Sequence, residues 1–434
     1  MNYRQALELL KRRGNEVQGI HLGLHRITAI LAALGNPQRR YPVLHIAGTN
    51  GKGSVAAMAE SILRHMGRRT GLYTSPHLVK VEERIRVCGH DVSPRSFAKL
   101  TATIHKAERA LLKRGLLDRP LTYFEFVTAC SFEHFAEQHV DNAVIEVGLG
   151  GRLDATNVVL PGACVITGIS YDHEHLLGNT LTRIAREKAG IIKPGIPVVS
   201  GCRGAAVSGV IRRHARRRIA PLVEIDRDCS TRIIGEHRGR YAFDLATPHG
   251  KYRGIKLALA GRHQVRNAAL AVAGLEALQG SPLSVRAARL GLRQTEWPGR
   301  LDEYPGPRRT LLDGAHNLEG ARVLRVFLRS RPAKRIHLVF GALSDKDILR
   351  IGDCLFPLSQ AIHLTALKNA RTAIPEEIAA LHERYRSRMR MHSGARKALL
   401  AAWRECPRDG LVVVAGSLYL IGELLPTVRK SIRC

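Results

Sequence analysis

The sequence is poor in aromatic side chains and has no long apolar runs. Phe, Trp and Tyr make up 5% of its 434 residues, which leaves few rings for stacking on single-stranded nucleic acid. No run approaches the ~18–20 uninterrupted apolar residues of a membrane-spanning helix, and the first residues lack the apolar stretch of a secretory signal peptide. We therefore expect a cytoplasmic globular protein with no membrane attachment.

The eight cysteines stand far apart, and no Cys-x-x-Cys pair occurs among them. Zinc sites and disulfide frameworks normally bring cysteines closer together in sequence. We expect most of these cysteines to be small buried residues in a reducing compartment.

Acidic residues are scarce beside basic ones, with 37 Asp and Glu against 68 Lys and Arg and a net charge of +31. An excess of this size can attract polyanions, nucleic acid above all. The basic residues recur along the whole chain, however, from Arg12 and Arg13 to the 384–390 segment. We favour an Arg-rich solvated surface on an enzyme, part of which can serve anionic substrates. A nucleic-acid-stimulated NTPase or binding protein is the alternative from a different class.

The composition, 45% hydrophobic and 24% charged, is ordinary for a globular protein, and the length favours two domains. Short apolar runs alternate with helical patterns such as 55–66 and 375–386, which predicts a mainly parallel sheet in each half. Pro and Gly interrupt the pattern at 294–299. The predicted strands are 43–47, 143–147 and 164–167 before this break, and 310–313, 336–340, 361–364 and 411–415 after it.

The strongest local pattern is His-Ile-Ala-Gly-Thr-Asn-Gly-Lys-Gly-Ser at 45–54. A predicted strand enters it and a predicted helix leaves it, and its small residues let backbone N–H groups approach a phosphate. Lys52 adds a mobile charge for the β- and γ-phosphates. The pattern departs from the common G-x-x-x-x-G-K-[ST], because Ile46 stands at the first Gly and Gly53 follows the Lys. The expected nucleotide-binding residues of this loop are Gly48, Thr49, Asn50, Gly51, Lys52, Gly53 and Ser54.

Further segments follow in a fixed order: HLGLHR at 21–26, YTSPHL at 73–78, LTYFE at 121–125, EVGLGGRLDATN at 146–157, REKAG at 186–190, WPGR at 297–300 and DGAHN at 313–317. With the phosphate loop they resemble the folylpolyglutamate synthase/dihydrofolate synthase family, relatives of the muramyl-peptide (Mur) ligases, over nearly the whole chain. The resemblance implies an α/β protein. Residues 1–296 would form a P-loop ATPase-like domain that binds ATP and the pterin, and residues 297–434 a smaller Rossmann-like domain.

The resemblance also implies an activity. Members of this family consume ATP to activate a pteroate or folate carboxylate as an acyl phosphate, which then reacts with the amino group of L-glutamate. We expect both the dihydropteroate and the tetrahydrofolate reactions, in a monomer with small-molecule substrates and no specific nucleic acid. Another Mur-type amino-acid ligase is the nearer alternative.

Glu146 ends a predicted apolar strand, where a carboxylate is costly unless it is paired or bound to metal. Magnesium prefers oxygen ligands, and the resemblance implies that Glu146 holds Mg²⁺ with Ser75 and His173, in a site with two ions. An ion-paired acid is the alternative for Glu146. His173 lies in Asp-His-Glu-His at 172–175, which by itself fits a transition-metal site or an exposed pair.

Lys188 lies in a helical pattern, where a lysine is normally a solvated charge. In the family that it resembles, the matching lysine is carbamylated by CO₂, so Lys188 joins Lys52 and His173 as an expected catalytic residue. Burial that lowers the lysine pKa would favour the neutral amine that this reaction needs.

The resemblance assigns the pterin to three segments. Tyr123 and Phe124 could stack on the pterin ring, although core packing explains an aromatic pair equally well, and Asp154 could accept from the pterin amino groups. The expected substrate-binding residues are Leu22, Gly23, Leu24, Thr122, Tyr123, Phe124, Glu125, Leu153, Asp154 and Ala155.

The resemblance assigns further ATP contacts, with Arg300 on phosphate, Asp313 near the ribose, and His316 in the same turn. Asn267 matches a nucleotide-contacting Asn of the first domain. ATP would be clamped between the domains, and closure would keep water from the acyl phosphate. The 344–347 loop resembles one near the glutamate.

Overall fold

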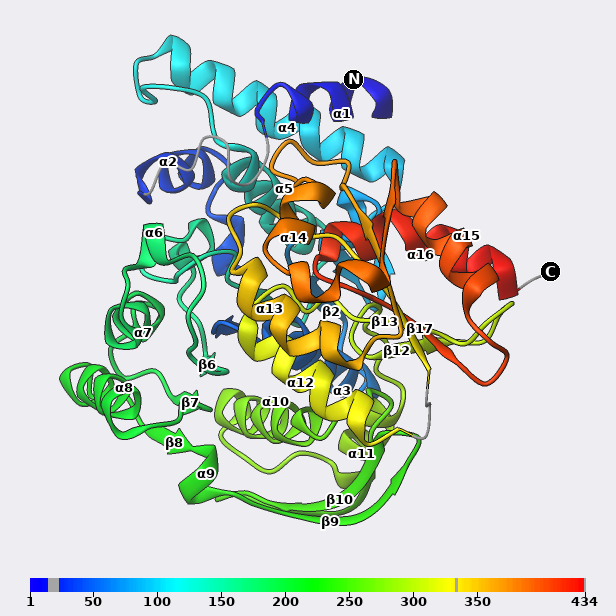
Figure 1. Cartoon of the computed structure of the whole chain (residues 1–434). Coiled ribbons are helices and arrows are strands. Elements are labelled where there is room, and N and C mark those ends of the chain that lie inside the picture. Colours follow the sequence, from blue (N-terminus) through cyan, green and yellow to red (C-terminus); the bar gives the residue numbers. More distant parts are fainter. Residues whose placement is uncertain (15–22, 332–334, 433–434) are drawn as a thin grey trace. The chain divides into compact units, whose positions relative to one another are not determined.

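The computed structural model describes residues 1–14, 23–331 and 335–432; the expected substrate residue Leu22 lies outside them. The described chain forms two α/β units around mainly parallel sheets (Figure 1), which confirms the predicted fold class. Unit 1 comprises Met1–Gly235, Ala242–Leu257 and Val265–Thr295, and unit 2 comprises Glu236–Tyr241, Ala258–Gln264 and Glu296–Cys434.

Unit 1 is built on an eight-stranded sheet in the order β4-β3-β2-β5-β1-β6-β7-β8. Strands β2, β5, β1, β6, β7 and β8 pair in parallel, whereas β3 pairs antiparallel with β2 and with the edge strand β4. All five residues of β1 are buried, as expected for a central strand of a covered parallel sheet. The strands are β1 Val43–Ala47, β2 Thr70–Tyr73, β3 Ile85–Val87, β4 His90–Asp91, β5 Asn142–Glu146, β6 Ala163–Ile166, β7 Val198–Ser200 and β8 Leu222–Glu224.

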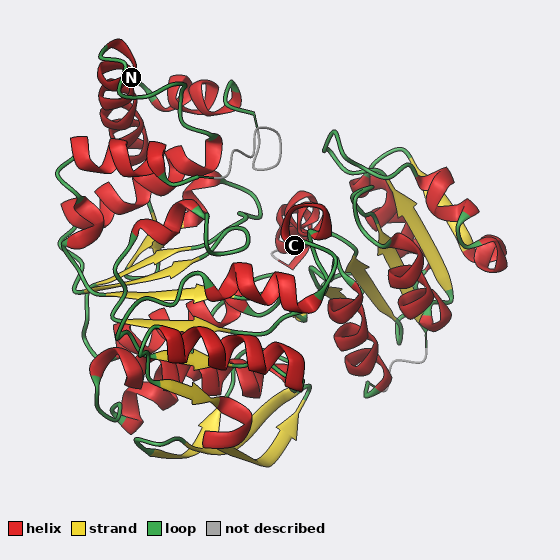
Figure 2. Ribbon diagram, turned by 90° about the vertical axis from the view of Figure 1, so that its left-hand side faces the viewer, coloured by secondary structure: helices red, strands yellow, loops and turns green. Residues whose placement is uncertain are grey.

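Helices cover both faces of this sheet (Figure 2). Val43 belongs to the core that α5 fills with Phe126 and Phe132, whereas Leu44 faces Gly274 of α10, as alternation along a strand requires. The helices are α1 Tyr3–Lys11, α2 His25–Ala33, α3 Lys52–His65, α4 Pro94–Lys113, α5 Tyr123–Glu137, α6 Glu174–Leu177, α7 Leu181–Ala189, α8 Ala205–Arg217, α9 Ile225–Asp228, α10 His263–Gln279 and α11 Val285–Arg293, with short 3₁₀ turns at Pro37–Arg39, Val81–Arg84 and Ala155–Val158.

A separate three-stranded sheet follows in the order β11-β10-β9. Its strands are β9 Ser230–His237, β10 Arg240–Ala246 and β11 Lys251–Lys256. Helix α11 packs against β11. The same helix approaches α3 closely at Gly291, where an added Cβ would lie 2.6 Å from the Ile62 backbone.

Unit 2 has a six-stranded sheet in the order β12-β13-β17-β14-β15-β16, parallel except at β12. The predicted strands of this half are confirmed to within a residue. The elements are β12 Asp302–Tyr304, β13 Thr310–Leu312, β14 Ile336–Phe340, β15 Ala361–Thr365, β16 Met389–His392, β17 Leu411–Ala415, α12 Leu318–Arg329, α13 Ile348–Leu355, α14 Pro375–Ala380, α15 Ala395–Glu405 and α16 Leu418–Ile432, with 3₁₀ turns at Phe356–Leu358 and Glu383–Arg388.

The predicted helix over 375–386 is wrong in its second half, because α14 ends at Ala380. His382 leaves the helical conformation, with φ −134° and ψ 42°. Its buried ring bonds the Leu349 carbonyl at 3.1 Å and packs on Gly352, where a Cβ would come within 2.2 Å. This tertiary contact overrides the local helical pattern.

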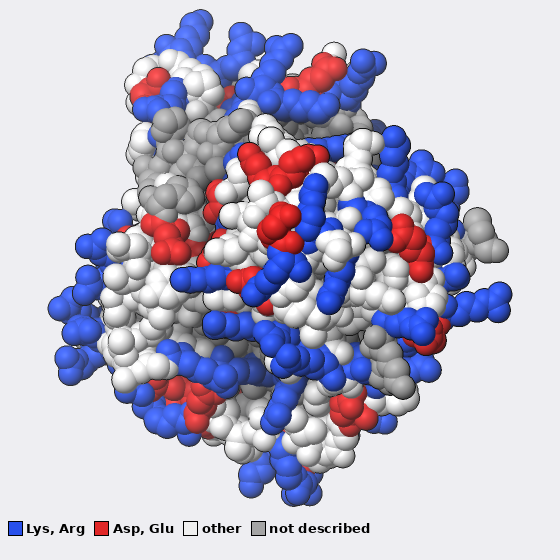
Figure 3. Space-filling model, in the orientation of Figure 1, with Lys and Arg blue, Asp and Glu red and all other residues white. Residues whose placement is uncertain are grey.

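Lys and Arg are spread over the whole face drawn in Figure 3, with Asp and Glu in small groups between them. No helix of the described residues is both long and apolar enough to cross a membrane. The seven described cysteines are free thiols, and five of them are buried, as expected.

Candidate active site

The phosphate loop joins β1 to α3, and two of its glycines have backbone angles that favour glycine, with φ 149° at Gly48 and 86° at Gly51. A Cβ on Gly48 would lie 1.9 Å from Thr167 Oγ1, and one on Gly51 would lie 2.8 Å from Asn267 Oδ1. The loop therefore depends on glycine at both positions, and it brings the predicted Asn267 against its backbone.

The loop is held by the segment that follows β6, the strand beside β1. Thr49 N donates to the Gly168 carbonyl at 2.8 Å, and Thr49 Oγ1 donates to the Ser170 carbonyl at 3.2 Å. Thr167 Oγ1 donates to the Asn50 carbonyl at 2.7 Å. The sequence prediction missed Thr167 and Ser170, although their place after a predicted strand could have marked them.

Helix α3 begins at Lys52, so its positive N-terminal end faces the loop, an arrangement suited to phosphate. Lys52 Nζ donates to the carbonyls of Gly48 at 3.1 Å and Thr49 at 3.2 Å. Ser54 lies buried in the first turn of the helix. The loop thus brings the N-terminal end of α3 and the Lys52 ammonium group together at one glycine-rich turn.

The predicted Mg²⁺ ligands follow neighbouring strands of the same sheet. Glu146 ends β5 and is 4% exposed, and its Oε2 accepts from the backbone N of Ser75, after β2, at 3.3 Å. His173 follows β6 with φ 51°, and its ring Nε2 lies 3.7 Å from Asp172 Oδ1. Strands β2, β5, β1 and β6 are adjacent and parallel. Ser75, Glu146 and His173 therefore lie at or beyond the carboxyl ends of these strands, where α/β proteins bind ligands.

Lys188 lies in α7 and is 4% exposed, so the solvated interpretation of this lysine is wrong. Its Nζ donates to the Gly48 carbonyl at 2.8 Å. Burial, followed by repulsion from Lys52, lowers the pKa of Lys188 to about 7, although Asp172 and Asp154 oppose the shift. A large fraction of this amine is therefore neutral near pH 7.

Residues 122–125 lie at the start of α5, where a capping box and an ion pair hold them in place. The Thr122 hydroxyl caps the helix by accepting from Glu125 N, and Thr122 N donates to the Glu125 carboxylate. Buried Glu125 also forms an ion pair with buried Arg26 at 3.1 Å. These contacts account for Thr122 and Glu125 without a ligand. Tyr123 and Phe124 are half-buried; the Arg84 guanidinium lies 5.4 Å from the Tyr123 ring centre.

Asp154 is buried and organises the turn in which it stands. Its carboxylate accepts from Leu149 N at 2.8 Å, Thr156 N at 3.0 Å and Thr156 Oγ1 at 2.5 Å, and burial raises its pKa. Among the other expected substrate residues, Leu153 is half-buried, Ala155 is buried, and Gly23 and Leu24 lead into α2.

In unit 2, Arg300, Asp313 and His316 meet at the turn after β13. Asp313 accepts from Leu301 N at 2.9 Å and Ala315 N at 3.0 Å, and burial raises its pKa, although Arg300 opposes the shift. His316 Nδ1 lies 2.9 Å from the Gly314 carbonyl oxygen, and a Cβ on Gly314 would meet the Arg300 guanidinium at 2.4 Å.

Comparison with known proteins matches the Mur ligase middle domain to residues 46–275 and the Mur ligase glutamate ligase domain to residues 299–418. The chain is 36% identical to the dihydrofolate synthase/folylpolyglutamate synthase of Bacillus subtilis over 96% of each chain, and 36% identical to the dihydrofolate synthetase of Saccharomyces cerevisiae over 95% of this chain and 99% of the relative.

Two solved structures agree with these relatives. Folylpolyglutamate synthase of Mycobacterium tuberculosis, complexed with ADP, superposes with a TM-score of 0.93 at 33% identity over 98% of each chain. FolC of E. coli, in complex with DHPP and ADP, gives 0.87 at 30% identity over 98% of each chain. The chain therefore has the Mur ligase fold and belongs to the dihydrofolate synthase/folylpolyglutamate synthase family.

Proposed function

We propose that this protein is an ATP- and Mg²⁺-dependent ligase that joins L-glutamate to the carboxyl group of dihydropteroate and of tetrahydrofolates. The observation that carries this proposal is that the phosphate loop, Glu146 with Ser75, and Lys188 meet at one edge of the unit 1 sheet. The names of the relatives and the nucleotide bound in the solved structures support it.

The reaction has two displacements. A carboxylate oxygen attacks the γ-phosphorus of ATP and ADP leaves; the glutamate nitrogen then attacks the acyl carbon, and phosphate leaves with one of the former carboxylate oxygens. Both steps need negative charge to be stabilised on phosphoryl oxygens. In the nucleotide complex we expect Lys52 to exchange its bonds to the Gly48 and Thr49 carbonyls for phosphate oxygens.

Glu146, Ser75 and His173 are our proposed Mg²⁺ ligands. The residues fit the ion, because a carboxylate buried as deeply as Glu146 needs charge compensation and the Ser75 backbone holds it in place. When bound, Mg²⁺ would neutralise charge on the transferring phosphoryl group. The left-handed backbone of His173 is the kind of strain that clusters at functional sites.

We infer that Lys188 is carbamylated. The protonated amine would first lose one proton. The neutral amine would then attack the carbon of CO₂ and release a second proton, which leaves a carbamate anion beside the phosphate loop. Burial and a pKa of about 7 supply the neutral amine that this step needs. The resulting anion would assist a second Mg²⁺, in keeping with its place beside Gly48.

For the pterin we propose a wall made by Gly23, Leu24, Tyr123 and Phe124, with Leu153 and Ala155 beside the turn. Half-buried aromatic rings can stack on a flat heterocycle. Gly148 leaves room for Phe124, since a Cβ there would lie 2.4 Å from its ring. Thr122, Glu125 and Asp154 would act by holding this wall, given the internal bonds that they make.

In unit 2 we propose that Arg300 contacts an ATP phosphate, that Asp313 lies near the ribose and that His316 completes the turn. The 344–347 loop is our choice for the glutamate region. This loop lines an open pocket of about 320 Å³. Its Asp345 carboxylate forms an ion pair with Arg371 at 3.0 Å. Residues 1–296 would bind ATP and pterin, and residues 297–434 would contribute the glutamate and ATP contacts.

We further propose a cytoplasmic monomer with both synthase activities and no specific nucleic-acid partner. Basic side chains distributed over the face drawn in Figure 3 support a solvated enzyme surface over a nucleic-acid groove. The test is the ATPase rate with dihydropteroate plus glutamate against the rate with RNA. Stimulation by the small molecules alone supports the ligase; stimulation by RNA alone contradicts it.

A further inference from the structure

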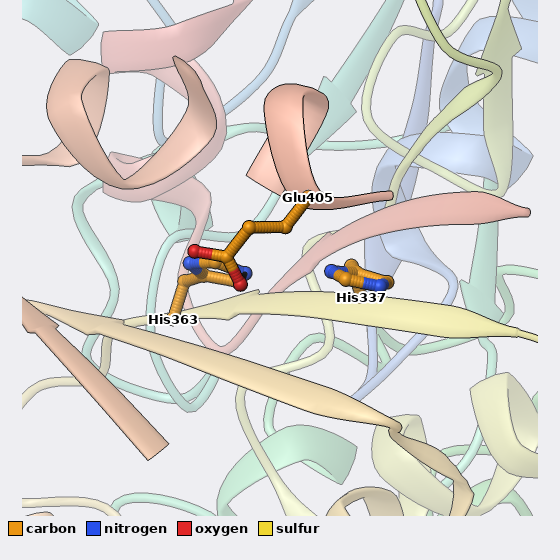
Figure 4. A group of neighbouring side chains, drawn as sticks. All are labelled: His337, His363 and Glu405. Carbon is orange, nitrogen blue, oxygen red and sulfur yellow. Dashed lines mark ion pairs between the residues drawn. The ribbon is translucent and has the colours of Figure 1, made fainter. Parts of the chain in front are cut away.

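Unit 2 holds a histidine cluster that the proposed reaction does not use. His337, His363 and His392 lie on the adjacent strands β14, β15 and β16. His363 pairs with Val339, two residues after His337, and with Arg390, two residues before His392. Because strand side chains alternate, all three histidines project from the same face of the sheet. Helix α15 packs on these three strands and brings Glu405 to the group (Figure 4).

The rings form a stacked row. The His337 and His363 centres lie 5.8 Å apart, and those of His363 and His392 lie 5.2 Å apart. One ligand atom each from His337, His363 and Glu405 falls within 4.8 Å of the others. Ligand atoms around a tetrahedral Zn²⁺ lie ~3.4 Å apart, so the side chains must approach one another by up to ~1.4 Å to bind one ion. Glu405 Oε2 and His363 Nε2 are already 3.8 Å apart, and the Glu405 side chain is 42% exposed.

Two buried ring nitrogens, His337 Nδ1 and His363 Nε2, have no hydrogen-bond partner among the described residues. His363 Nδ1 lies 3.1 Å from His392 Nε2, and one of these two nitrogens donates its proton to the other. If His363 donates, its Nε2 is a bare lone pair 3.8 Å from Glu405 Oε2, so two acceptors face each other. If His392 donates instead, the His363 Nε2–H faces Glu405. In the first case a cation between the buried Nε2 and the exposed carboxylate would satisfy both acceptors.

Burial, then His392, His337 and Arg390, lower the pKa of His363 to about 3. Burial also lowers the pKa of His337 and of His392, against the opposing charge of Glu405. Independently of these shifts, the cluster places two imidazole nitrogens and a carboxylate oxygen close enough together to act as a donor set for one metal ion.

We propose that His337, His363 and Glu405 form a binding site for a divalent transition-metal ion, with Zn²⁺ as the reference ion. Imidazole nitrogen with one carboxylate favours Zn²⁺, Cu²⁺ or Ni²⁺ over Mg²⁺. His392 is a positioning residue, because its bond to His363 Nδ1 turns the Nε2 lone pair toward the site, as partners of metal-bound histidines commonly do. The ion would tie β14 and β15 to the end of α15.

The test is equilibrium dialysis of the full chain against Zn²⁺ in excess Mg²⁺, with Co²⁺ absorption as a second readout. Glu405→Gln is the main variant because Glu405 is exposed and its loss leaves the fold intact. We expect one Zn²⁺ per chain, bound at least ~10-fold more weakly in Glu405→Gln and in His392→Gln. Glu376→Gln removes an exposed acid of the same unit and serves as the matched control.

Glu146→Gln separates this site from the phosphate-loop edge, because it should leave the Zn²⁺ affinity unchanged. Co²⁺ should give the intense visible bands of a four-coordinate ion in wild type and in Glu376→Gln, and weak bands in Glu405→Gln. The proposal is overturned if wild type retains no Zn²⁺, if Glu405→Gln and His392→Gln bind as tightly as wild type, or if Glu146→Gln abolishes the binding.

Discussion

The protonation of Lys188 gives a prediction with a defined pH dependence. With a pKa of about 7, the amine is about 9% neutral at pH 6, about 50% at pH 7 and about 90% at pH 8. After exhaustive removal of CO₂, return of a fixed CO₂ concentration should restore activity at a rate that follows this fraction. The rate should rise about fivefold from pH 6 to 7 and less than twofold from pH 7 to 8.

A lysine with an ordinary pKa of ~10.4 would instead react about tenfold faster with each pH unit across this range. The assay is ligase turnover after timed exposure to ¹³CO₂, with the carbamate carbon followed by ¹³C NMR. A tenfold rise per pH unit, or full activity with no carbamate signal, would refute the assignment. Lys188→Arg should lose ~10²-fold or more of the activity, whereas Lys99→Arg, on the exposed face of α4, should be neutral.

Three further substitutions test other parts of the site. Lys52→Ala should lower kcat by ~10²–10³ with an unchanged melting temperature, because it removes a charge from a loop outside the core; near-normal turnover would contradict the phosphate-loop role. Glu146→Gln should abolish most ligation, and a Mg²⁺ titration should rescue little; full activity at ordinary Mg²⁺ would exclude its role as a ligand. Arg26→Met should cost ~3–5 kcal/mol in urea unfolding, because Glu125 is left buried without its partner; a loss below ~1 kcal/mol would show that the pair contributes little.

The parts of the fold that the sequence predicted are those with strong local patterns. The buried runs at Val43–Ala47 and Ile336–Phe340 appear as β1 and β14 with the expected bounds. The 375–386 helix failed because the contact that ends it, between His382 and Gly352, joins residues far apart in the chain. Local patterns do not contain such contacts.

The same distinction holds for the site. The phosphate loop is one continuous segment, and its chemistry follows from its residue order. The buried amine of Lys188 donates to the carbonyl of Gly48, which is 140 residues away, so the sequence alone left its two interpretations open. The His337, His363 and His392 row has no local motif, because only strand pairing brings these residues together.

The central claim is that a carboxylate is activated by phosphoryl transfer at the phosphate loop. The direct measurement uses dihydropteroate labelled with ¹⁸O in its carboxylate, with ATP, Mg²⁺ and L-glutamate, and analyses the products by mass spectrometry. We predict dihydrofolate together with inorganic phosphate that carries one ¹⁸O atom per turnover, and at least ~10²-fold less of both from Lys52→Ala in the same time. Unlabelled phosphate beside newly formed dihydrofolate, or ¹⁸O in AMP, would contradict the acyl phosphate and the role given to the loop.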